Sequence, residues 1–113
     1  MSAGIEMSLD VTLTKLEPTE VFESNITHNL GDMATAAGVY NYLWRPDTVG
    51  VTRAKQLIKP LEAGLARLQA YPDKYRKYDS PNGWGEYEDL VWFVEQYLDA
   101  CKAHPDAEVS VSR

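Results

Sequence analysis

The chain has little of what would assign it to a chemical class. It has one cysteine, Cys101, and two histidines among its 113 residues. An internal disulfide is therefore impossible, and no pair of these residues has the spacing of metal ligands. No apolar run is long enough to span a bilayer, and residues 1–20 contain no continuous apolar segment of the kind that forms a signal peptide. We therefore expect a cytoplasmic protein without a membrane segment, metal or cofactor.

Positive charge is also scarce. Eleven basic residues face 17 acidic ones, which gives a formal net charge of −6. Proteins that bind nucleic acids need a basic stripe, so we expect no nucleic-acid partner. The hydrophobic fraction of 44% is that of a folded globular protein. We expect one domain over residues 8–113, preceded by a disordered leader or tag remnant at residues 1–7.

Two short segments near the ends of the chain have the pattern of strands. Leu9, Val11 and Leu13 alternate with polar residues, which predicts a strand over residues 8–14. Val109 and Val111 predict another over residues 108–112. A lone strand is not viable, so the two are expected to pair, in an antiparallel sense.

The residues between these strands predict helices. A first helix is expected to begin at Ser24 or Asn25 and to end before Pro46, a second to run from Thr52 to Pro72, and a third from residue 86 to 103. Pro60 should kink or split the second helix, or open a separate one. Residues 73–78 are expected to add a short helical turn. The predicted fold class is α+β, with three to four helices packed on a two-stranded antiparallel sheet. The first helix would bury an apolar stripe of Ile26, Leu30, Met33 and Ala37.

Two segments mix aromatic rings with amide, imidazole and guanidinium groups. One runs from residue 25 to 29 and on to residues 40–46; the other runs from residue 81 to 87. Rings beside a few orienting polar groups are typical of a pocket for a small ligand. The ligand-binding residues predicted on this basis are His28, Asn29, Tyr40, Trp44, Arg45, Asn82, Trp84 and Tyr87.

Each of these features also has a purely structural interpretation. His28 would then be a surface imidazole or one hydrogen-bonded to the fold, and Trp44 a hydrophobic plug beside a surface arginine. Trp84, between two glycines, would anchor a turn that leads into the third helix. Residues 71, 75 and 78 are tyrosines at helical spacing, which indicates core packing or a protein interface.

Catalysis has weaker support than binding. His28 is a weak candidate for a general base, since no nucleophile accompanies it. Cys101 lies on the apolar stripe of the third helix and is expected to be a small core residue. The glycines at positions 83 and 85 lack the strand and the third glycine of a phosphate-binding loop. We therefore favour a protein without enzymatic activity.

Taken together, four motifs resemble a group of small uncharacterised proteins of bacteria and their phages. The similarity covers Ser8 to Arg113. It implies a phage or prophage origin and an accessory role such as host take-over or counter-defence, and it implies no catalytic residue. The motifs are Asn25-Ile26-Thr27-His28-Asn29-Leu30, Ala37-Gly38-Val39-Tyr40, Leu43-Trp44-Arg45-Pro46 and Asn82-Gly83-Trp84-Gly85.

Three functional hypotheses follow. The first is a binding protein for a small polar or nucleotide-like ligand, or for a protein partner. The second is a small hydrolase or transferase with His28 as general base. The third is a structural or interaction protein that forms a homodimer through its tyrosines. The first hypothesis requires residues 25–46 and residues 81–87 to meet in space.

Overall fold

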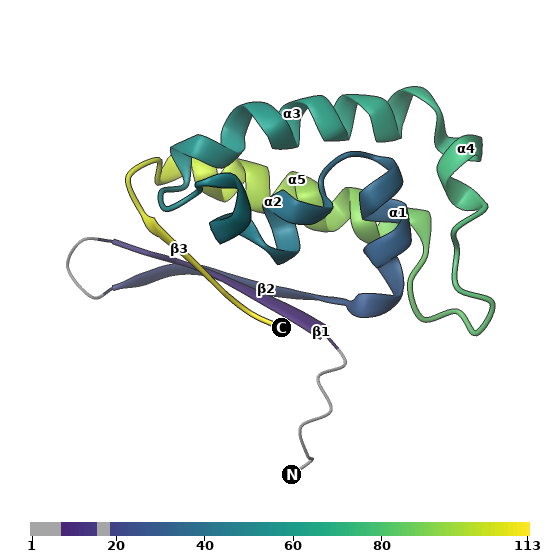
Figure 1. The fold of residues 1–113 in the computed structure, drawn as a ribbon, viewed down its shortest axis with the longest axis horizontal. Coiled ribbons are helices and arrows are strands. Elements are labelled where there is room, and N and C mark those ends of the chain that lie inside the picture. The colour runs from purple at the N-terminus through teal and green to yellow at the C-terminus, as the bar shows by residue number, and fades with distance from the viewer. Residues whose placement is uncertain (1–7, 16–18) are drawn as a thin grey trace, which may run out of the picture.

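The computed structural model describes residues 8–15 and 19–113, so the leader expected at residues 1–7 lies outside the described part. Within that part, a three-stranded antiparallel sheet is covered on one face by helices (Figure 1). The strands are β1 (Ser8–Thr14), β2 (Glu20–Thr27) and β3 (Glu108–Ser112), in the order β2-β1-β3. The α+β fold class is thus confirmed.

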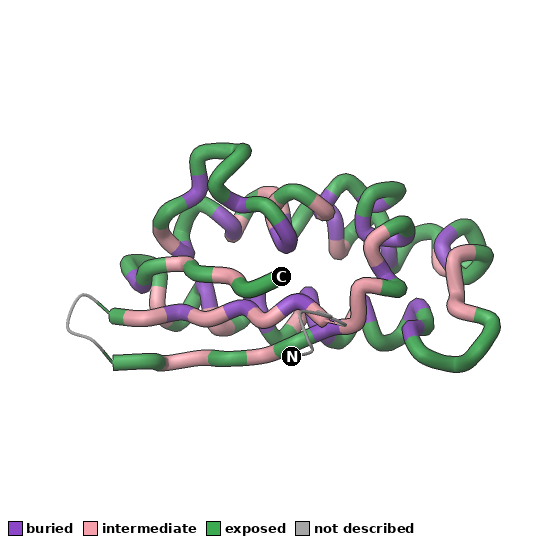
Figure 2. Tube along the Cα trace, turned by 60° about the horizontal axis from the view of Figure 1, so that its bottom comes forward, coloured by how far each residue is buried: buried purple, intermediate pink, exposed green. Residues whose placement is uncertain are grey.

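The predicted pairing of the two terminal strands is confirmed. β1 and β3 are antiparallel, with Val11 opposite Val111 and Leu13 opposite Val109. The apolar residues of β1 are fully buried while their neighbours are partly exposed, which gives the alternating colours along this strand in Figure 2. This is the pattern of an antiparallel sheet with one face on the core and one toward solvent.

The expectation of a two-stranded sheet was wrong, because β2 is a third strand. We had expected the first helix to begin at Ser24 or Asn25, within the residues of this strand. A bulge conceals the strand in the sequence: Phe22 pairs with Leu13 and Glu20 with Thr14, which leaves Val21 without an opposite residue. The extra residue breaks the period of two. Ser24 and Asn25, which we interpreted as helix caps, lie within the strand.

The single first helix was also wrong. The chain leaves β2 through a short 3-10 helix, η1, and then forms two short helices, α1 and α2. Gly38 separates them with a φ of 80°, a conformation that favours glycine and ends a helix. The helices are η1 (His28–Leu30), α1 (Gly31–Ala36), α2 (Tyr40–Trp44), η2 (Pro46–Val49), α3 (Lys55–Ala70), α4 (Pro72–Arg76) and α5 (Tyr87–Ala103).

The later helices lie close to their predicted positions. α3 is one continuous helix with Pro60 inside it, so the expected split does not occur. α5 begins with a capping box, in which the Glu86 and Asp89 side chains each accept a backbone N–H. α4 corresponds to the predicted short turn.

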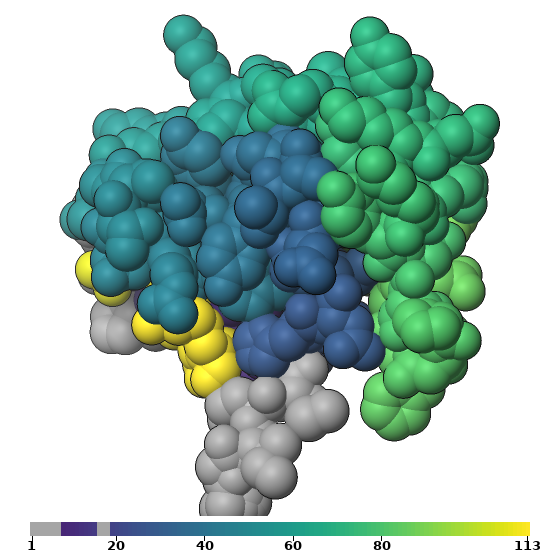
Figure 3. Space-filling model, turned by 45° about the vertical axis from the view of Figure 1, so that its right-hand side comes forward, coloured from purple at the N-terminus to yellow at the C-terminus, as the bar shows by residue number. Residues whose placement is uncertain are grey.

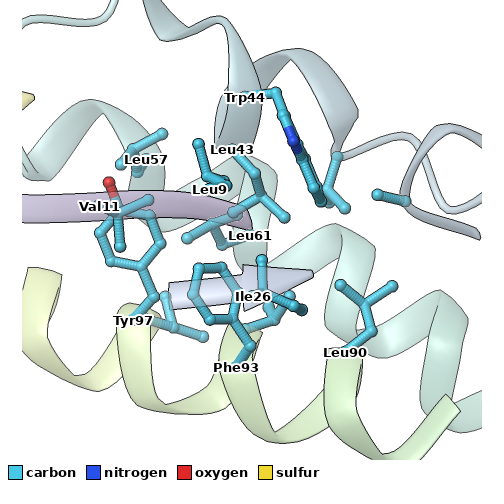
Figure 4. Close-up of a cluster of buried hydrophobic side chains, with 14 of the residues drawn as sticks. Leu9, Val11, Ile26, Leu43, Trp44, Leu57, Leu61, Leu90, Phe93 and Tyr97 are labelled. Atoms are coloured by element: carbon cyan, nitrogen blue, oxygen red, sulfur yellow. The ribbon is translucent and has the colours of Figure 1, made fainter. Parts of the chain in front are cut away.

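One hydrophobic core joins the sheet to the helices. α3 packs on α5, and α5 packs on β2. Leu9 and Val11 of β1 point toward Leu61 of α3 and Tyr97 of α5 (Figure 4). The stripe predicted for one helix is buried throughout, although Ile26 belongs to β2 and Leu30 to η1.

Candidate ligand-binding cleft

An open cleft of about 640 Å³ lies where η1, α1 and α2 meet the end of the chain after β3. The space-filling view of this face shows the C-terminal residues (yellow) beside the segment that carries these helices (blue) (Figure 3). The cleft contains five of the eight predicted ligand-binding residues. It is lined by His28, Asn29, Gly31, Asp32, Thr35, Tyr40, Trp44, Arg45 and Arg113.

Local structure fixes the aromatic wall of the cleft. Tyr40 and Trp44 are four residues apart on α2, so their side chains share a face. Their rings stack with centroids 5.1 Å apart and an interplanar angle of 9°. Gly31 packs beside the Tyr40 ring, where an added Cβ atom would make an ordinary van der Waals contact of 3.5 Å with Cε1. Trp44 is buried and Tyr40 is half-buried, so the tyrosine ring is the more accessible of the two.

His28 is held by the indole of Trp44. Nε1 of Trp44 donates a hydrogen bond to Nδ1 of His28 over 2.7 Å. An indole nitrogen only donates, so Nδ1 carries no proton. In the neutral ring the proton is therefore on Nε2, which makes that atom a donor. Thr27 caps the start of η1, because its hydroxyl accepts a hydrogen bond from the backbone N–H of Asn29.

Two guanidinium groups and one carboxylate give the cleft its charge. Arg45 follows α2 and is exposed, and Asp32 is exposed on α1. Arg113 donates from Nη1 to the carbonyl oxygen of Trp44 over 2.9 Å. A guanidinium has five N–H donors, so Arg113 retains further donors beside this bond. The lining side chains together carry one formal positive charge when His28 is neutral.

The two predicted segments do meet in space. Nδ2 of Asn29 donates to the carbonyl oxygen of Trp84 over 2.8 Å. Gly85 lies so close to η1 that an added Cβ would be 3.1 Å from Thr27 and 3.2 Å from Leu30. The contact is made by the backbone of the glycine-flanked turn, while its side chains are elsewhere.

The three other predicted residues do not line the cleft. Asn82 accepts the backbone N–H of Trp84 on its Oδ1 and so stabilises the turn. The Trp84 side chain is 66% exposed. The hydroxyl of buried Tyr87 donates to the carbonyl oxygen of Leu68, and Arg76 lies over its ring at 4.6 Å. Burial raises the pKa of Tyr87 above its ordinary value.

Four cleft residues were missed in the sequence, namely Gly31 at the start of α1 and three residues with polar side chains. Asp32 and Thr35 project from α1, one turn apart, and Arg113 arrives through β3. The signal that could have found Asp32 and Thr35 is their spacing of three positions, since residues at this spacing share a helix face. No local motif marks Arg113, because the β1–β3 pairing alone brings it to residues near position 44.

The one cysteine of the chain belongs to the hydrophobic core. Cys101 is fully buried, and burial raises the pKa of its thiol to about 12. Among residues 8–15 and 19–113, no three His, Cys, Asp or Glu side chains gather as a metal site would require. The same residues include no helix with the length and apolar character needed to cross a bilayer.

The three tyrosines expected on one face are separated by the fold. Tyr71 lies at the end of α3 and is 61% exposed, whereas Tyr75 is buried on α4. Tyr78 is partly buried beyond that helix. These residues therefore do not form the continuous surface that the homodimer hypothesis assumed.

Comparison with known proteins provides no family. No protein-family model, curated protein or solved structure matches this chain. The resemblance to small proteins of bacteria and phages stays a prediction.

Proposed function

We propose that the protein binds a small ligand that carries both an anionic group and a planar ring. The observation that carries this proposal is the convergence of Tyr40, Arg45 and Arg113 on one open cleft. Residues from distant parts of the sequence supply a stacking surface and two positive charges there. A carboxylate or phosphate fits guanidinium groups that line the same cleft, and a flat ring fits the tyrosine face.

The polar side chains of the cleft have separate roles in this binding mode. The exposed guanidinium of Arg45 would form a hydrogen-bonded ion pair with the anionic group. Nε2 of His28, a donor in the neutral ring, would add a neutral hydrogen bond. Asp32 on α1 would repel a second anionic group, or accept a hydrogen bond from a hydroxyl of the ligand. A nucleoside monophosphate has all of these features.

The position of His28 supports binding over catalysis. A general base needs a free nitrogen lone pair directed at the substrate. The lone pair of Nδ1 is occupied by the Trp44 indole, and Nε2 carries the proton in the neutral ring. His28 would have to break its bond to Trp44 to accept a proton there.

The test follows the amide NMR signals of isotope-labelled protein during titration with three probes: adenosine monophosphate, adenosine and inorganic phosphate. We expect the nucleotide to bind at least about tenfold more tightly than adenosine or phosphate, because it contacts the tyrosine ring and the guanidinium groups at the same time. Shifts should concentrate at residues 28–45 and at Arg113. If none of the three probes shifts these signals at about 1 mM, a concentration that detects weak binding, the proposal fails.

Two variants test which residue binds each part of the nucleotide. Arg45→Ala should reduce the advantage of the nucleotide over adenosine, because Arg113 is then the one guanidinium left in the cleft. Tyr40→Leu should reduce its advantage over phosphate. Lys59→Ala is the control, because it removes a positive charge from an exposed position of α3. Equal weakening by Lys59→Ala and Arg45→Ala would show that only net charge matters and would contradict a specific site.

A further inference from the structure

A second hollow lies on a different part of the surface. It has a volume of about 210 Å³ and runs between the end of β2 and the first turns of α5. It shares no lining residue with the cleft described above. Its walls are Asn25, Ile26 and Thr27 from the strand and Asp89, Trp92 and Phe93 from the helix.

The strand beside this hollow is an open edge. β2 is the outermost strand on its side of the described sheet, with β1 as its neighbour. In an antiparallel pair, alternate residues direct their N–H and C=O groups away from the partner strand. An edge of eight residues therefore presents a row of backbone groups that can pair with another extended chain.

The same region exposes two of the three tryptophans. Trp92 of α5 is 57% exposed and Trp84 is 66% exposed, whereas Trp44 is buried. Trp92 forms a wall of the hollow, and the carbonyl of Trp84 is bonded to Asn29, two residues after β2 ends. Exposed tryptophans beside an open strand edge are typical of interaction surfaces, where they contribute a large share of binding energy.

Charge indicates the kind of partner. β2 carries exposed Glu20 and Glu23 and has no lysine or arginine. On α5, Asp89 and Asp99 are exposed, and the helix has one basic residue, Lys102, which pairs with Glu62 on α3. A second copy of this chain would bring acidic edge to acidic edge, so a basic partner fits better.

We propose that β2 and the Trp92 hollow together bind an extended, basic segment of another protein. The segment adds to the sheet as a further strand beside β2, held by backbone hydrogen bonds. An apolar side chain of the segment occupies the hollow against Trp92. Its lysine or arginine residues alternate with the apolar ones and face Glu20 and Glu23. This surface is independent of the proposed small-molecule cleft.

The probe for the test is a nine-residue peptide of alternating lysine and valine, with a glutamate–valine peptide of equal length for comparison. Hydrogen exchange and NMR titration of the full chain report on individual amides. We expect the lysine peptide to slow exchange along β2 and to shift the indole signal of Trp92. The glutamate peptide should do neither. Absence of protection along β2, or equal binding of both peptides, would overturn the proposal.

Variants at exposed positions keep the test separate from folding. Trp92→Ala should lower the affinity for the lysine peptide by about tenfold or more, the size of effect expected for a tryptophan at the centre of an interface. Glu23→Lys should weaken it as well and allow the glutamate peptide to bind. The matched control is Tyr71→Ala, which removes an exposed aromatic ring outside the hollow and should change neither affinity.

Self-association through the same edge would contradict the proposed occupant. Sedimentation of the unmodified chain over a range of concentrations measures it directly. We expect a monomer without peptide. A dimer that Glu23→Lys strengthens or Trp92→Ala dissolves would assign the surface to a second copy and overturn the basic partner.

Discussion

The indole of Trp44 and the imidazole of His28 form one hydrogen-bonded unit at 2.7 Å, with ring centroids 6.1 Å apart. The bond connects α2 to η1 across 16 residues of sequence. It provides a partner for a buried indole N–H and fixes the tautomer of the histidine. The cleft therefore has a preset donor at Nε2.

This unit predicts a measurable coupling. A double-mutant cycle with Trp44→Phe and His28→Ala should give an interaction energy of about 1 kcal/mol, the typical net value of such a hydrogen bond. Urea denaturation of the four proteins measures it. The nitrogen chemical shifts of His28 should independently show the proton on Nε2. Strictly additive losses would contradict the coupling.

Gly85 should be intolerant of substitution. Its φ of 120° strains any other residue, and an added Cβ would lie 3.1 to 3.3 Å from Thr27, Leu30 and Asn29. Gly85→Ala should lower the free energy of unfolding by about 2–3 kcal/mol, since strain and crowding both act. Gly83 is the matched control. It has a φ of 78° with no atom within 4 Å of an added Cβ, so Gly83→Ala should cost only about 1 kcal/mol. Equal losses in the two variants would show that the contact with η1 adds nothing.

Tyr97→Phe should stabilise the protein. The Tyr97 hydroxyl is buried, and no hydrogen-bond partner is found for it in the described part of the chain. Removing an unsatisfied buried hydroxyl should raise the free energy of unfolding by about 1 kcal/mol. Tyr87→Phe should do the reverse by a similar amount, because that hydroxyl donates to Leu68. Thermal and urea denaturation measure both; a loss in Tyr97→Phe would reveal a partner for the hydroxyl.

Cys101 should be chemically inert in the folded chain and should make stability fall at alkaline pH. Burial raises the pKa of its thiol from 9.0 to about 12. Between these values the unfolded chain loses the thiol proton and the folded chain retains it, so the free energy of unfolding decreases as pH rises. Below pH 9 the thiol keeps its proton in both the folded and the unfolded chain, so Cys101 causes no loss of stability there.

Iodoacetamide labelling provides the direct measurement. At pH 9 the folded protein should react far more slowly than the protein in urea, because the thiolate is the nucleophile. Cys101→Ala should lose part of the alkaline decrease in stability, with the buried Tyr97, whose pKa is also raised, responsible for another part. Rapid labelling of the folded chain would mean that α5 opens or that the thiol is accessible.

The parts of the fold that could be predicted are those with unbroken periods. β1 alternates cleanly from Leu9 to Leu13, and α5 keeps one apolar face from Leu90 to Cys101. β2 could not be predicted because a bulge at Val21 interrupts its period and its polar residues resemble helix caps. The burial of Ile26 and Leu30 was anticipated even where the secondary structure was not, since hydrophobicity determines burial more directly than it determines conformation.

The candidate cleft was predicted in part for a similar reason. Tyr40, Trp44 and Arg45 lie close together in sequence, so any local structure keeps them near one another. Trp84 and Tyr87 were grouped with them by chemical type, which does not fix where a side chain points. The fold brings the backbone of the Trp84 turn to Asn29 and leaves the indole in solvent.

The spacing of neighbouring side chains was enough to predict the apolar residues that would be buried, the two terminal strands and the long α5 helix. Two features became visible in the complete fold alone: β2 is an open edge beside Trp92, and Arg113 joins Tyr40 and Arg45 in one cleft. Both depend on which strands pair and in what register. Strand pairing and register depend on the packing of the whole core, which no short segment of the chain determines.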